Sequence, residues 1–309
     1  MEILKYLCHH IFMIDICKAH SLEETLKTGK SFLKEAGVES FDLDAKVLLS
    51  YVLGMESYEL VANPNIEIPL KFCHQYMKLL KRRGAFEPIA QITKSKEFWA
   101  LPFKISKKTL IPRPDSETMI EAVKSEFKDK NFSYKILDMG TGSGCLLLSL
   151  MSEFKQAFGI GIDIQSGAVK VAKENAKILS LDNRAVILKQ NWHKKKPSKK
   201  ITKHKFHIII SNPPYITSQD MKSLAKDVKK YEPKKALWGG RDGLDEYRSL
   251  SQAIYDWEIL EDGGRIFLEL GRGQENDVKQ IFEAFGFNFE KYFKDLSGII
   301  RVIEFSKKK

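Results

Sequence analysis

A glycine-rich turn between a strand pattern and a helix pattern is the first feature that could do chemistry. The run 138–144 reads Asp-Met-Gly-Thr-Gly-Ser-Gly and joins an apolar stretch at 134–139 to a helical pattern at 145–154. Glycines let the chain turn sharply and let a ligand lie against the backbone, while the helix N-terminus presents free amide N–H groups. Because doubly wound sheets bind ligands outside the carboxyl ends of their strands, this turn is a candidate ligand site. Its members are Gly140, Thr141, Gly142, Ser143 and Gly144.

An acidic residue at the end of the next strand pattern indicates what kind of ligand this would be. Asp163 closes the apolar run at 157–164, about 20 residues after the glycines, where a carboxylate can accept hydrogen bonds from ribose hydroxyls. The glycine spacing is GxGxG and differs from the GxGxxG of dinucleotide enzymes. The pair therefore predicts a nucleoside ligand without fixing which one, and a purely structural turn is the alternative.

A second candidate site, Asn212-Pro213-Pro214-Tyr215, follows the apolar run at 206–211. Asn-Pro is common in surface turns, which is the alternative interpretation. The preceding run, however, predicts a core strand, so these residues lie at the same sheet edge as the glycine turn. The two prolines stiffen the backbone and carry no N–H, which leaves their carbonyls as fixed acceptors beside the asparagine oxygen and the tyrosine ring. We expect this loop to receive and orient a planar NH2 group.

Methylation of a planar nitrogen by a sulfonium methyl group suits such a loop. The nitrogen lone pair is delocalised, and acceptors on both N–H bonds hold it toward the methyl group at a near-attack separation of roughly 3 Å. No histidine, cysteine or carboxylate adjoins residues 212–215 in the sequence. We therefore expect positioning and electrostatics to act in place of a strong general base.

The elements that must position these residues fall into two regions. From residue 117 onward, strand and helix patterns alternate, which predicts an α/β domain with a mostly parallel sheet covered on both faces. The expected strands are 134–139, 157–164, 185–188, 206–211, 264–270 and 298–305, and the expected helices are 145–154, 167–179 and 274–285.

Residues 21–90 instead predict a small helical bundle. A capping box at Ser21–Glu24 opens its first helix, and Gly54 ends the second, which begins at Phe41. Residues 97–111 predict a β-hairpin, interrupted by Pro102, that joins the two regions. Asp115 or Ser116 is then placed to cap the following helix.

Bulk properties limit the function classes. With 309 residues, 43% hydrophobic and 29% charged, the chain can bury a sizeable core, and no apolar run approaches the roughly 20 residues that span a bilayer. Residues 1–20 lack the features of a signal peptide, and Met13 is an alternative start. The four cysteines show no CxxC spacing and predict neither a metal site nor disulfides, so we expect a cytoplasmic protein. The net charge of +11 suits a polyanionic partner, although the lysine run at 194–205 is equally typical of a solvated loop.

The glycine turn, the acidic strand end and the Asn-Pro-Pro-Tyr run together resemble class I S-adenosylmethionine methyltransferases that methylate amino groups. Other segments resemble one family more closely, the release-factor glutamine N5-methyltransferases of the HemK/PrmC type. The similarity covers roughly residues 21–305. Its further segments are EPIAQITKSKEFWALPFKI, TLIPRPDSE, GIDIQSGAVKVAKENA, YEPKKALWGGRDGLDEYR and GGRIFLELG.

The resemblance implies a Rossmann-like, doubly wound, seven-stranded sheet with a small N-terminal helical domain and a connecting hairpin. The implied divisions are an extension of uncertain order at 1–20, a substrate-docking domain at 21–93, a linker at 94–116 and a catalytic domain at 117–309. A monomeric enzyme that does not require nucleic acid is expected.

The resemblance also implies a cofactor, a substrate and residue roles. S-adenosyl-L-methionine would be held by Gly140–Gly144, Asp163 and Asn212, with Trp192 near its adenine. Asn212–Tyr215 would receive the glutamine of the Gly-Gly-Gln loop of a peptide chain release factor and carry catalysis. Arg113 either lines this site or makes a structural salt bridge.

The sequence departs from the family pattern at three positions: Asn191 stands where Asp usually precedes the tryptophan, Gln91 where Tyr is frequent, and Lys94 where Gly is frequent. Three alternatives stay open. They are an adenine N6-methyltransferase acting on nucleic acid, a ribosomal-protein glutamine methyltransferase, and a binding protein that kept the fold.

Overall fold

The computed structural model describes residues 21–194 and 196–308, which form two compact units divided between Lys94 and Ser95. The predicted extension at 1–20 and the alternative start at Met13 lie outside the described residues. Every helix within the described residues is too short or too polar to traverse a lipid bilayer.

The first unit is a helical bundle, as the sequence predicts. Its helices are α2 (Leu22–Glu35), α3 (Phe41–Leu53), α4 (Ser57–Ala62), α5 (Leu70–Gly84) and α6 (Ile89–Thr93). The Ser21 hydroxyl accepts from the Glu24 amide at 3.3 Å, and Gly54 ends α3 with a left-handed φ of +67°. The short helices α4 and α6 were not predicted. Lys94 follows α6 with a φ of +59°, a conformation that favours glycine, the residue that the resemblance leads us to expect there.

The hairpin is shorter than the predicted 97–111 and belongs to the second unit. It consists of β1 (Ser95–Phe98) and β2 (Leu101–Lys104), with Pro102 inside β2 opposite Glu97. Proline is tolerated there because each strand of a two-stranded ribbon is an edge strand. The indole N–H of Trp99 donates to Glu153 at 2.8 Å, and the Lys104 amide donates to Asn175 at 2.8 Å. These bonds attach the hairpin to the helices of the second unit.

A seven-stranded sheet forms the centre of the second unit, in the order β5-β4-β3-β6-β7-β9-β8. The first five strands in this order are parallel, and β9 runs antiparallel to both β7 and β8, which confirms the predicted mostly parallel sheet. The edge strand β8 was missed because the apolar alternation that begins at Phe287 and Phe289 is broken at Lys291, where the strand register also shifts. The strands are β3 (Lys135–Met139), β4 (Phe158–Asp163), β5 (Ala185–Lys189), β6 (Phe206–Ser211), β7 (Leu260–Glu269), β8 (Phe287–Lys294) and β9 (Ile300–Lys307).

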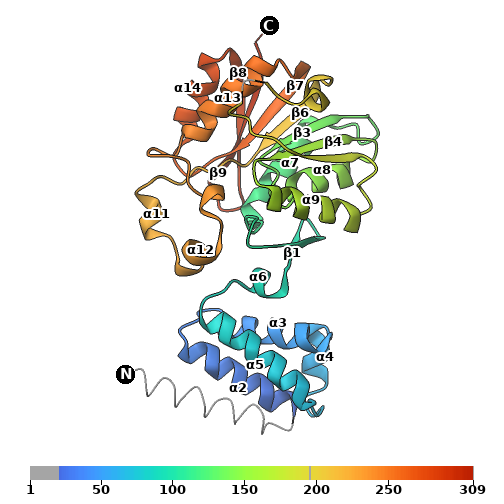
Figure 1. Ribbon diagram of the computed structural model, residues 1–309, viewed down its shortest axis with the longest axis vertical. Coiled ribbons are helices and arrows are strands. Elements are labelled where there is room, and N and C mark those ends of the chain that lie inside the picture. The colour runs from blue at the N-terminus through green and yellow to red at the C-terminus, as the bar shows by residue number, and fades with distance from the viewer. Residues whose placement is uncertain (1–20, 195, 309) are drawn as a thin grey trace. The chain divides into compact units, whose positions relative to one another are not determined.

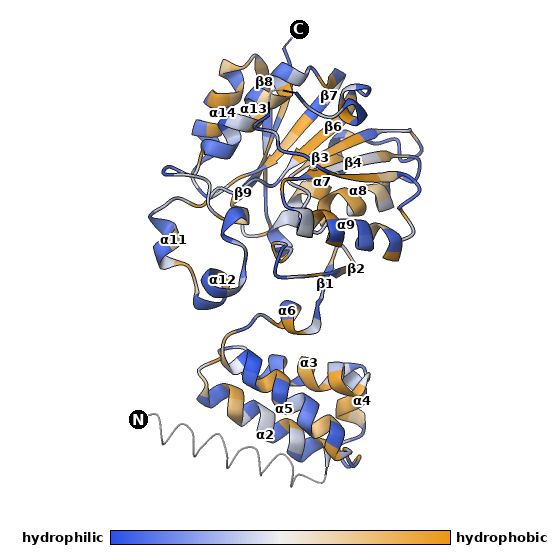
Figure 2. Cartoon of the chain, viewed as in Figure 1, coloured by the Kyte–Doolittle hydropathy of each residue, from blue (hydrophilic) through white to orange (hydrophobic). Residues whose placement is uncertain are grey.

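Helices cover both faces of this sheet (Figure 1). On one face lie α7 (Glu117–Glu126), α8 (Cys145–Glu153) and α9 (Ser166–Ile178), and on the other lie α13 (Asp245–Trp257) and α14 (Glu275–Ala284). Alternate strand residues such as Leu137, Ile209 and Ile266 pack with Tyr247 and Leu250 of α13 in one buried cluster. Figure 2 shows the resulting apolar sheet centre, where burial of each large aliphatic side chain contributes about 1.5–3 kcal/mol.

Short helices lie in the loops after β5 and β6. The lysine run that predicts a solvated loop is partly helical, because α10 (Lys199–Thr202) is capped by Ser198 and anchored by the buried Ile201. A hydrophilic lobe after β6 carries α11 (Asp220–Ser223), α12 (Lys226–Tyr231) and the 3-10 helix η2 (Lys234–Ala236).

Candidate active site

The glycine turn has the backbone conformation that its sequence predicts. Gly140, Gly142 and Gly144 have φ values of +90°, +56° and +83°, which side chains with a Cβ adopt only at a cost. The amides of Gly140 and Thr141 both donate to the carbonyl of Ile162 at 2.9 Å, so the turn is bonded directly to β4. The turn therefore lies at the carboxyl ends of two neighbouring parallel strands, with α8 beginning immediately after it.

Two carboxylates accept hydrogen bonds from the glycine turn and fix its conformation. Asp163 accepts from the Gly142 amide at 3.0 Å and from the Gln165 amide at 2.7 Å, and burial raises the pKa of its carboxyl. Asp138 accepts from the Thr141 hydroxyl at 2.7 Å, and burial raises the pKa of its carboxyl to about 7. Asp163 also lines a pocket above the turn, where its side chain can accept further donors.

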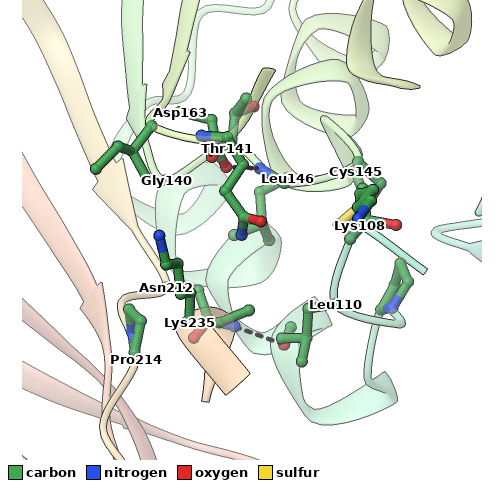
Figure 3. A pocket seen from close by; sticks show the side chains of 18 of the residues that line it. Lys108, Leu110, Gly140, Thr141, Cys145, Leu146, Asp163, Asn212, Pro214 and Lys235 are labelled. Carbon is green, nitrogen blue, oxygen red and sulfur yellow. Dashed lines mark hydrogen bonds between the residues drawn. The ribbon is translucent and has the colours of Figure 1, made fainter. Parts of the chain in front are cut away.

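Asn212 lies on that same pocket. Figure 3 shows Asn212 and Pro214 facing the cavity together with Gly140, Thr141 and Asp163. The structure thus brings the two sequence motifs to one cavity at one edge of the sheet. Ser143 and Trp192 also line the pocket. Three other predicted site residues do not line it: Gly144, Pro213 and Tyr215.

Only one of the two polar groups in the Asn212 side chain makes a hydrogen bond within the described residues. Its NH2 group donates to the Ser116 hydroxyl at 3.4 Å, whereas its oxygen has no hydrogen-bond donor among the described residues. Over the same residues, no backbone N–H donates to the carbonyls of Pro213 and Pro214. Ser116 precedes α7 as predicted, but its side chain makes no capping bond.

Contacts from later in the chain fix the shape of the 212–215 loop. The Gln274 side chain donates to the carbonyls of Tyr215 at 3.1 Å and Gly243 at 3.3 Å. Gly239 packs so tightly that an added Cβ would lie 2.5 Å from the Pro214 carbonyl oxygen. Burial raises the pKa of the Tyr215 phenol to about 12, so this group stays neutral at physiological pH.

Trp192 packs over the glycine turn. A Cβ added to Gly140 would lie 3.4 Å from the indole ring, and the indole N–H donates to Glu246 at 2.9 Å. His193 is exposed and also contacts Glu246 at 3.0 Å. The side-chain oxygen of Asn191 accepts from the His193 amide at 2.9 Å, and Asn191 does not line this pocket. Its side chain therefore stabilises a local turn.

Arg113 combines the two roles that the sequence left open. Arg113 lines the pocket, and its guanidinium pairs with Glu232, whose side chain is 1% exposed. Glu232 in addition accepts from the Ile111 amide at 3.3 Å. Further residues that line the cavity were not identified from the sequence, among them Lys108, Thr109, Leu110, Pro112, Lys235 and Ala236.

A further carboxylate, Glu269, lies beside Asn212 at the end of β7 and was also missed. No carboxylate adjoins residues 212–215 along the sequence, but Glu269 adjoins them in space because β6 and β7 pair up to Ser211 and Leu268. Burial raises the pKa of the Glu269 carboxyl to about 7, and hydrogen bonding from Ser116 and Asn212 acts against this rise. The only local signal is an acidic residue at the end of the apolar run 264–270, at the same sheet edge.

Comparison with known proteins identifies both units. Residues 24–93 match the family model described as the PrmC N-terminal domain, and residues 130–237 match a methyltransferase domain. The release factor glutamine methyltransferase of Caulobacter vibrioides is 34% identical over 283 residues, which cover 92% of this chain and 95% of that protein. The protein of the same name from Rhodospirillum rubrum is 37% identical over 278 residues, which cover 90% of this chain and 82% of that protein.

A solved structure provides a comparison of fold. A methyltransferase from Pyrococcus furiosus aligns with a TM-score of 0.50 at 16% identity, covering 74% of this chain and 99% of that chain. Together with the strand order, this likeness shows that the fold is that of the class I methyltransferases.

Proposed function

Because the chain belongs to the release factor glutamine methyltransferase family, we propose that it methylates N5 of the glutamine in the Gly-Gly-Gln loop of a peptide chain release factor. The observation that carries this proposal is that Asn212, whose NH2 group donates to Ser116 and leaves its oxygen free to accept, lines the same cavity as the glycine turn and Asp163. A glutamine amide that enters this cavity meets an acceptor for its N–H groups beside the nucleoside site.

We propose S-adenosyl-L-methionine as the methyl donor, since the residues present fit it. The buried Asp163 carboxylate suits ribose hydroxyls, and the Trp192 ring suits a flat base. The turn at 140–144 carries three glycines, so a ligand can approach its backbone closely. When bound, this cofactor supplies an electrophilic methyl group.

The chain's own residues act by orientation. The Asn212 oxygen and a proline carbonyl accept from the two N–H bonds of the substrate amide, which fixes the plane of the amide and the direction of its lone pair. The preorganised dipoles of the 212–215 loop also stabilise the positive charge that develops on nitrogen in the transition state. Tyr215, held behind the pocket by Gln274, keeps the loop in place.

The test is mass spectrometry of the release factor after incubation with the protein and S-adenosylmethionine. We expect a gain of one methyl group on the loop glutamine, lost with the Asn212→Ala variant. Asn212→Asp is the matched comparison: it keeps the acceptor oxygen but replaces the NH2 donor with a second, charged acceptor, so it should retain S-adenosylmethionine binding and lose most activity. An unmodified release factor in the wild-type reaction would refute the proposal.

The same assay separates the alternatives. Labelled methyl groups appearing on nucleic acid alone would favour the adenine methyltransferase, and label on a ribosomal protein alone would favour the other glutamine substrate. No transfer despite cofactor binding would favour a binding protein. Since release factors act in translation, we propose a cytoplasmic location and retain the prediction of a monomer.

A further inference from the structure

Glu269 is a buried carboxylate next to the residue that is proposed to orient the substrate. Its side chain belongs to the last residue of β7 and is 3% exposed. Ser211 of β6 pairs in register with Leu268 of β7, so Asn212 and Glu269 follow side by side at the carboxyl edge of the sheet. The Tyr247 hydroxyl donates to the Glu269 carbonyl at 2.8 Å, which fixes this end of the strand.

The side chains of Asn212, Ser116 and Glu269 lie together at this edge. Asn212 donates from its NH2 group to the Ser116 hydroxyl at 3.4 Å. Burial raises the pKa of the Glu269 carboxyl, and hydrogen bonding from Ser116 and Asn212 acts against this rise. The second carboxyl oxygen, Oε2, is buried and has no hydrogen-bond partner among the described residues. A buried carboxylate oxygen that lacks a partner attracts N–H and O–H groups of neighbouring side chains and repels their oxygens.

We infer that Glu269 is a positioning residue for methyl transfer, whose carboxylate holds the NH2 group of Asn212 on its own side and thereby turns the Asn212 oxygen toward the substrate. This inference rests on the proposed function of Asn212. Glu269 does not line the pocket, so it acts through Asn212 and not on the substrate. A flipped Asn212 amide would present donors to the N–H groups of the substrate and could not bind it.

The orientation depends on the charge of Glu269. Burial raises the pKa of the Glu269 carboxyl to about 7, while Ser116, Arg301 and Asn212 act in the opposite direction. The other ionisable groups that face it are Asp115, Tyr215, Tyr247 and Cys145. Once protonated, the carboxyl of Glu269 can donate a hydrogen bond to the Asn212 oxygen, which favours the flipped amide. Because the flipped amide does not bind the substrate, activity should decrease as the pH falls through this pKa.

The kinetic test compares the full-length wild type with Glu269→Gln on the release factor substrate. In the wild type, we expect kcat/KM to fall below about pH 7 with the slope of one ionisation. In Glu269→Gln this slope should disappear, and the plateau should be about 10- to 100-fold lower because orientation is lost. The Kd for S-adenosylmethionine should stay within a few-fold of wild type.

Glu304→Gln is the matched control. Glu304 on β9 is equally buried, and burial raises the pKa of its carboxyl to about 7, but it pairs with Arg265 and has no contact with Asn212. This variant should keep both the pH slope and the plateau. A Glu269→Gln enzyme that keeps the wild-type slope and rate would overturn the inference while leaving the proposed function intact.

A second measurement requires neither a variant nor the release factor. The side-chain amide resonances of Asn212, identified by their loss in Asn212→Ala, should titrate in the wild-type protein with a midpoint near the pKa of Glu269. Titration without release factor methylation would refute the proposed function alone, and resonances that do not change with pH would refute the role of Glu269.

Discussion

Replacing Gly239 with alanine should impair substrate positioning while sparing cofactor binding. The added Cβ would lie 2.5 Å from the Pro214 carbonyl oxygen and 2.7 Å from Tyr215 Cα, and both contacts are with backbone that cannot rotate away. Because ordinary contact begins near 3.4 Å, the loop must withdraw by about 0.9 Å. A displacement of this size costs on the order of 100-fold in rate, equivalent to about 2.7 kcal/mol.

The assay measures kcat/KM for methylation of the release factor and, separately, the Kd for S-adenosylmethionine by calorimetry. We expect an unchanged Kd, since Gly239 does not line the cofactor pocket. Gly263→Ala is the control: its φ of +78° makes alanine strained, but the added Cβ would meet nothing within 4 Å. It should lose about 1–2 kcal/mol of stability and keep its activity. A Gly239→Ala enzyme as active as the wild type would refute the reasoning.

Two further predictions concern the carboxylates beneath the glycine turn. Asp163→Ala should weaken S-adenosylmethionine binding about 10- to 100-fold, since hydrogen bonds to a charged acceptor contribute about 1.5–3 kcal/mol, and an unchanged Kd by calorimetry would contradict this role. Asp138 has its pKa raised by burial from 3.8 to about 7, so the stability it confers is complete below 3.8 and is lost as the pH rises through 7. Asp138→Asn keeps an acceptor for Thr141 but cannot ionise. Its free energy of unfolding, measured in urea, should therefore rise relative to that of the wild type as the pH increases from 3.8 to about 7. A difference that does not vary with pH would contradict the raised pKa of Asp138.

Local patterns were sufficient to locate both halves of the site. The glycine turn and Asp163 lie where apolar strand patterns end, and parallel strands bring their carboxyl ends to one edge. Asn212 was placed at that edge by the same argument. Each of these predictions needs only short-range sequence information and the general rule for parallel sheets.

The contacts that orient Asn212 could not be predicted in this way. Glu269 reaches Asn212 only because β7 pairs with β6, a non-local register that periodicity does not reveal. Gly239 and Gln274 support the 212–215 loop from segments 24 or more residues further along the chain, and nothing in their own neighbourhoods indicates this. The helix α13, by contrast, has an amphipathic pattern that was readable and was missed.

The two halves of the site are held by different kinds of contact, which has a functional consequence. The glycine turn is held by bonds within residues 138–165 and by the Asn175 side chain, which donates to the Ser143 carbonyl at 2.8 Å, so substitutions there should change cofactor affinity first. The 212–215 loop is held from behind by Glu269, Gln274 and Gly239, none of which lines the pocket. Substitutions in this second group should change turnover first, because a loop that shifts misaligns the substrate amide without removing any contact to the cofactor.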